Sequence, residues 1–118
     1  MADLAETLRS RLRLALRDAM RARHSRETRV IRLLIAAIDD AQAIPIGDEH
    51  EPYTERAFGD GTAEVPRREL GESDLSALFE REIAARRAAA EEVRRVGRTD
   101  DAAGLDDEVQ IIRRFAET

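Results

Sequence analysis

The sequence predicts an all-α fold, a compact bundle of four helices in one domain. Three observations lead to this prediction. The chain has 118 residues, enough for one domain and too few for two ordinary ones. Apolar residues recur at helical spacing in four separate stretches, and all 3 prolines fall between the second and the third stretch. We therefore expect helices over about residues 2–23, 27–43, 72–97 and 100–117.

The first two helices are predicted from their apolar faces. The first carries an apolar side chain at every fourth position, at Leu4, Leu8, Leu12, Leu16 and Met20. His24 and Ser25 break this pattern. The run Val30–Ile38 is then apolar on nearly all sides except at Arg32, and its length and charged flanks favour a buried helix over a strand. This second helix is the predicted core.

A long acidic loop is predicted between the second and third helices. Residues 44–70 contain every proline, together with Gly47, Gly59 and Gly61, so regular structure should fail there. Residues 44–72 carry three arginines against eight acids. A loop of this length is uncommon in a compact domain, so either it contacts a partner or it is mobile.

The last two helices have recognisable ends. Gly71 can begin the third helix with Asp74 at its third position, and Leu70 can pack on Leu75. Gly97 suits a left-handed turn at the end of that helix. The apolar face of the fourth helix follows at Leu105, Val109, Ile112 and Phe115, with Gly104 weakening its first turns.

Composition excludes several classes of protein. The net charge of -5 argues against a generally basic nucleic-acid binder and against a membrane-surface protein. The chain has no Cys, so it can form no disulfide and no thiolate metal site. Its longest apolar run, Val30–Ile38, is too short to span a bilayer. We expect a cytoplasmic protein.

A row of arginines near the start of the chain is an exception to this net negative charge. Arg9, Arg13, Arg17 and Arg21 stand at strict four-residue spacing, and a helix would stack them into a basic stripe. No acid lies three or four positions from Arg13 or Arg17. Like charges so placed repel by roughly 0.2–0.5 kcal/mol per pair, so the stripe needs an anion.

Three sources can supply that anion. The arginines can lie over the edge of the core and pair with acids of the same chain, including those of the loop. They can bind the phosphates of an RNA. They can also meet an acidic protein surface, in which case the domain is a helical interaction or homo-oligomerisation module.

The sequence offers little reaction chemistry. His50-Glu51 begins like a zinc-protease motif, but the second His is missing and Pro52 forbids the helix, so we expect no metal site. We expect no cofactor and no catalytic residues, and enzymatic activity is disfavoured. Arg32 interrupts the apolar helix, and we expect a structural ion pair between it and a carboxylate such as Glu108.

The ordered set of helices resembles a known family. Ala19–Arg23 followed by Thr28–Ile38 looks like the opening helical hairpin of the GatB/YqeY family. Leu75–Ile83, Gly97-Arg98 and Glu108–Phe115 follow that family's N-terminal helical domain in order. The resemblance covers almost the whole chain except the loop.

The resemblance implies a domain related to the tail of the tRNA-dependent amidotransferase B subunit, a region that the family associates with tRNA. It implies basic contact residues at Arg13, Arg17, Arg21 and Arg23, next to Arg9 of the stripe. We therefore expect a non-catalytic accessory domain near tRNA or translation. A carbon–nitrogen ligase role with glutamine as amido donor would follow from family relation only. Residues 44–70 are a longer insert than usual, and we expect the family's C-terminal helical module to be absent.

Overall fold

The structure, a computed structural model, describes residues 3–43 and 67–116 and confirms the all-α fold. Its helices are α1 (Leu4–Ala22), α2 (Ser25–Gln42), α4 (Glu72–Arg95) and α5 (Thr99–Ala116). All four begin and end within about two residues of the positions predicted from the apolar pattern.

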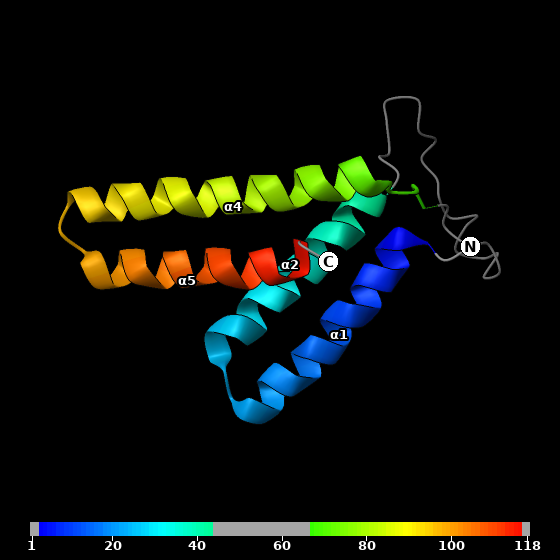
Figure 1. Cartoon of the computed structure of the whole chain (residues 1–118), viewed down its shortest axis with the longest axis horizontal. Helices are drawn as coiled ribbons and strands as arrows, with labels where there is room; N and C mark the ends of the chain where they lie inside the picture. The colour runs from blue at the N-terminus through cyan, green and yellow to red at the C-terminus, as the bar shows by residue number, and fades with distance from the viewer. Residues whose placement is uncertain (1–2, 44–66, 117–118) are drawn as a thin grey trace, which may run out of the picture.

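The helices form two antiparallel hairpins (Figure 1). One hairpin pairs α1 with α2 through the two residues Arg23 and His24, and the other pairs α4 with α5 through a short turn. The α1–α2 hairpin runs obliquely to the other, and α2 packs against α5 and the start of α4. The turn of the α1–α2 hairpin and the far end of the α4–α5 hairpin therefore project away from the region where the two hairpins meet.

The core lies where the hairpins meet, and α2 supplies most of its completely buried side chains. The largest fully buried residues are Leu12, Val30, Ile31, Leu34, Ile38 and Ile112. Phe79 of α4 and Phe115 of α5 close the core from the second hairpin, at 4% and 8% exposure. This confirms the apolar run at Val30–Ile38 as the central helix.

Local interactions fix where the helices begin and end. The Asp3 carboxylate accepts a hydrogen bond from the Ala5 amide at 3.1 Å and caps α1. Arg23 then adopts a left-handed conformation with φ 62°, so that α2 begins at Ser25 and not at residue 27. The Gly71 amide donates to Asp74 at 2.9 Å, and Gly97 has φ 83°, as the glycines predict.

The two ends of the predicted loop are joined. Ala43 and Arg67 form an antiparallel bridge, and the Arg68 amide donates to the Gln42 carbonyl at 2.7 Å. Leu70, still within the predicted loop, is buried in the core at 2% exposure. Residues 44–66 lie outside the described residues, and with them His50 and the acids from Asp48 to Glu64. Ala43 and Arg67, the described residues on either side of this segment, are therefore neighbours in the fold.

Because Ala43 and Arg67 are neighbours, residues 44–66 can be removed to test whether the four helices fold without them. Bridge partners in antiparallel strands lie about 5 Å apart, so a four-residue Gly/Ser linker can replace residues 44–66. We expect the shortened protein to unfold cooperatively, with stability equal to the parent's or greater by up to about 1.5 kcal/mol, because shorter loops cost less closure entropy. Urea unfolding followed by circular dichroism measures the change. A non-cooperative transition would show that residues 44–66 contribute to the core.

No helix in the described part of the chain is both long enough and apolar enough to span a membrane.

Candidate functional site

Arg9, the first residue of the predicted stripe, is buried. Its side chain is 3% exposed and forms salt bridges with Glu6, one turn earlier, and with Asp39 of α2 at 2.9 Å. Its guanidinium also donates to the Gln42 side chain, which is itself only 3% exposed. Arg9 thus joins α1 to the end of α2, and it is not available to a phosphate. The prediction that Arg9 binds nucleic acid together with Arg13, Arg17, Arg21 and Arg23 is therefore corrected: Arg9 has a structural role.

The remaining arginines of the stripe face outward because four residues are slightly more than one helical turn. Each step of four rotates the side chain by about 40° around the helix axis. Arg9 lies at the edge of the core, and by Arg17 and Arg21 the rotation has reached the outer face of α1. Arg13, Arg17 and Arg21 are accordingly exposed, as is Arg23 at the end of the helix.

These four exposed arginines lack the carboxylate partners that several arginines of the second hairpin have, although Arg81, Arg87 and Arg113 of that hairpin also form no salt bridge within the described residues. Within residues 3–43 and 67–116, no carboxylate forms a salt bridge with Arg13, Arg17, Arg21 or Arg23. On the second hairpin, salt bridges pair Arg94 with Asp106, Arg95 with Glu92 and Arg98 with Asp101.

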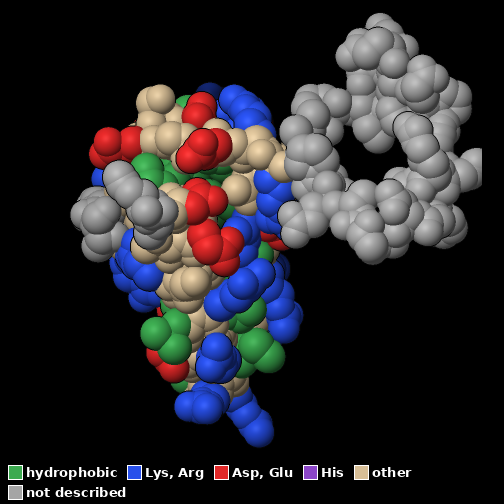
Figure 2. Space-filling view, turned by 90° about the vertical axis from the view of Figure 1, so that its right-hand side faces the viewer, with side chains coloured by type: hydrophobic (Ala, Val, Ile, Leu, Met, Phe, Trp, Pro, Cys, Tyr) green, Lys and Arg blue, Asp and Glu red, His purple; other side chains and the backbone are tan. Residues whose placement is uncertain are grey.

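The four arginines without carboxylate partners among the described residues also belong to one basic region of the surface. Figure 2 shows basic side chains gathered over the lower part of one face, toward the turn of the α1–α2 hairpin, with acidic side chains mostly above them. Residues 1–43 contain nine arginines against six acids, and Arg9 engages two of those acids, Glu6 and Asp39. The hairpin therefore presents a basic surface on a chain whose overall charge is -5.

The predicted ion pair between Arg32 and Glu108 is not formed, although Glu108 is the centre of a network. Its carboxylate, 12% exposed, accepts a hydrogen bond from Arg86 of α4 at 2.9 Å and one from Arg29 of α2 at 3.1 Å. Arg26 lies 3.5 Å away. Arg32 reaches α1 instead, where its guanidinium lies 3.7 Å from the Met20 sulfur. Arg26 and Arg29, at the start of α2, are the arginines of this helix that reach Glu108 of α5.

Gly104 makes room for this network. A Cβ at Gly104 would lie 2.5 Å from a terminal nitrogen of Arg26, so the absence of a side chain lets Arg26 lie across α5. Glu108 is one turn further along the same face of α5. The sequence shows a glycine inside a helix, and in the structure the Arg26 guanidinium lies in the space beside it.

A second link between α2 and α5 is electrostatic. Arg114 donates to the Glu27 carboxylate at 2.6 Å, and this hydrogen bond lowers the pKa of Glu27 below its ordinary value. The pair therefore stabilises the fold at neutral pH, and that contribution is lost as the pH falls through the lowered pKa.

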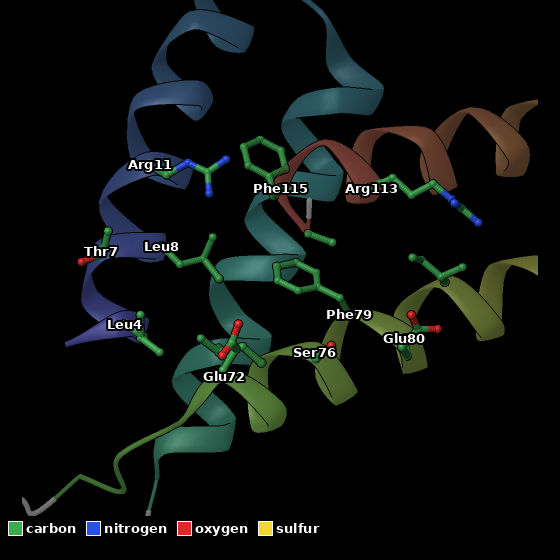
Figure 3. Close-up of a pocket in the computed structure, with 13 residues that line it drawn as sticks. Leu4, Thr7, Leu8, Arg11, Glu72, Ser76, Phe79, Glu80, Arg113 and Phe115 are labelled. Carbon is green, nitrogen blue, oxygen red and sulfur yellow. The ribbon is translucent and has the colours of Figure 1, made fainter. Parts of the chain in front are cut away.

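A groove of about 530 Å³ lies between the two hairpins (Figure 3). Leu8 of α1 and Phe79 of α4 point toward one another across it, and Arg11 lies 5.7 Å from the centre of the Phe115 ring. Glu72 and Glu80 stand on the α4 side. These side chains supply apolar contact and charges of both signs, and Thr7 and Ser76 add hydroxyl groups to the lining.

Comparison of the chain with family models, with curated proteins and with solved structures gives no match. The GatB/YqeY resemblance therefore remains a prediction.

Proposed function

We propose that this domain is a non-catalytic accessory module that binds RNA through the exposed arginines of the α1–α2 hairpin, Arg13, Arg17, Arg21 and Arg23. The observation that supports this proposal is their lack of carboxylate partners in the described chain, while most arginines elsewhere are paired. A polyanion would relieve the repulsion between neighbours on α1.

Arginine suits this role chemically. Its planar guanidinium presents paired N–H groups that match two phosphate oxygens, so each exposed arginine can bind one phosphate in a bidentate manner. Phosphate contacts carry no sequence information, which is what a general tRNA-associated module requires. The resemblance to the amidotransferase tail region makes tRNA the first RNA to test and the cytoplasm the expected compartment. An amidotransferase-associated role would need a partner chain to supply the chemistry.

The test is a fluorescence-anisotropy titration of labelled tRNA across a range of salt concentrations. We expect binding by the parent protein to weaken with salt, and the triple variant Arg13→Gln, Arg17→Gln, Arg21→Gln to lose most of it. The slope of log affinity against log salt should fall by about 2–3 in the variant, because each phosphate contact contributes roughly 0.7–0.9.

A matched control separates a local surface from net charge. The variant Arg94→Gln, Arg95→Gln, Arg98→Gln removes the same number of charges from the far end of the second hairpin, where each arginine has a carboxylate partner. It should bind tRNA nearly as well as the parent. Equal losses in the two triple variants, or no binding by the parent at low salt, would contradict the proposal.

A further inference from the structure

The turn of the α1–α2 hairpin contains an open hollow of about 770 Å³. It lies between the last turn of α1 and the first turns of α2. Its lining combines apolar, hydroxyl and guanidinium groups from Met20, Arg23, Ser25, Thr28, Arg29, Arg32 and Leu33. The volume falls within the range of sites that hold a small organic group.

The floor of the hollow is apolar and exposed. Met20 is 49% exposed and Leu33 is 48% exposed, and they come from different helices. A single exposed apolar residue is ordinary on a protein surface, but these two share one concave site. The flexible thioether of Met20 can adapt to a flat ring placed against it.

The rim of the hollow is basic. Arg23 and Arg32 form no salt bridge with any carboxylate of residues 3–43 and 67–116, while Arg29 is held by Glu108 at 3.1 Å. The Arg32 guanidinium lies 3.7 Å from the Met20 sulfur, so a cationic donor directly borders the apolar floor. The site can therefore hold a ligand with an apolar flat part and an anionic part next to it.

We infer that this hollow accepts one unpaired nucleotide of a single-stranded or looped RNA, an inference that rests on the RNA-binding function proposed above. The base would lie against Met20 and Leu33, and its phosphate would be bound by Arg23 and Arg32. The bases of a duplex are stacked and unavailable for such contact, whereas unstacked bases in loops and ends can be splayed into a protein site. The hollow would therefore select single-stranded segments, while the arginines of α1 bind backbone in either form.

The test compares two RNAs that carry the same charge. One is a short labelled oligouridylate, and the other is an abasic strand of the same length with the same phosphates. We expect the parent protein to bind the oligouridylate about three- to tenfold more tightly, which corresponds to the burial of one face of a base. The double variant Met20→Ser, Leu33→Ser should bind both strands equally, at the parent's affinity for the abasic strand.

The control variant is Leu14→Ser, which removes an apolar side chain of α1 that is 58% exposed and lies outside the hollow. It should keep the full preference for the oligouridylate, and thermal unfolding should show all three proteins folded. Equal binding of the two strands by the parent would overturn the inference, because the hollow would then contribute no contact to a base. The proposed function would still stand, since the phosphates alone would account for the binding. Binding of neither strand, nor of tRNA, would overturn both.

Discussion

Replacing Glu108 with alanine should lower the free energy of unfolding by about 2–3 kcal/mol at pH 7, roughly 10 °C in the unfolding midpoint. The Glu108 carboxylate is nearly buried and accepts from arginines of two other helices. Its loss leaves Arg86, whose side chain is 11% exposed, with Glu82 as its remaining partner at 2.8 Å. It also leaves Arg26 lying over Gly104 without the carboxylate that it faces.

A neighbouring carboxylate on the same helix provides the control. Asp106 is paired with Arg94, but both side chains are about half exposed, so Asp106→Ala should cost well under 1 kcal/mol. Urea unfolding of both variants and of the parent measures the difference. Equal effects of the two substitutions would mean that the Glu108 network contributes no more than an ordinary surface ion pair.

Replacing Arg9 with methionine should lower the free energy of unfolding by about 2 kcal/mol. Methionine can occupy the space of the arginine stem, so the loss measures mainly the polar contacts. Without the guanidinium, the buried Gln42 side chain keeps only a long contact to Arg67 at 3.4 Å, and Asp39 loses its cation. Arg9→Lys should recover part of the loss, because an ammonium keeps the charge but cannot match all three partners.

The control for Arg9 lies one turn along the same helix. Arg13→Met should change stability by no more than about 0.5 kcal/mol, because Arg13 is exposed and has no carboxylate partner among the described residues. For tRNA affinity the order of the two variants should be reversed. Folded Arg9→Met should bind tRNA as tightly as the parent, and Arg13→Met should bind it more weakly. A stability loss in Arg13→Met equal to that in Arg9→Met would contradict the distinction between a buried and an exposed part of the stripe.

The four helices are predictable from the sequence because their signals are local. Apolar spacing identifies the faces, Gly71 with Asp74 begins α4, and Gly97 ends it through a conformation that glycine adopts easily. The beginning of α2 is missed by two residues because Arg23 takes a left-handed conformation, which a non-glycine residue rarely adopts.

The candidate site is only partly predictable, because its details depend on how the two hairpins pack. Four-residue spacing identifies the arginines of α1, but the burial of Arg9 depends on Asp39 and Gln42, some thirty residues away. Rotation around the helix gives a usable signal, since it places Arg9 nearest to the apolar face of Leu12. The partners of Glu108 cannot be predicted without the angle between α2 and α5. The hollow at Met20 and Leu33 cannot be predicted without the geometry of the turn.

The slow rotation of the arginines around α1 sets a direction for any bound strand. A row of residues four apart is inclined at about 25° to the helix axis. A chain of phosphates that contacts Arg13, Arg17 and Arg21 in turn would therefore cross α1 obliquely, moving away from α2 as it approaches the turn. The hairpin would then orient the polymer as well as attract it. Moving the arginines to three-residue spacing, whose rows incline in the opposite sense at about 45°, would change the crossing angle while leaving the total charge the same.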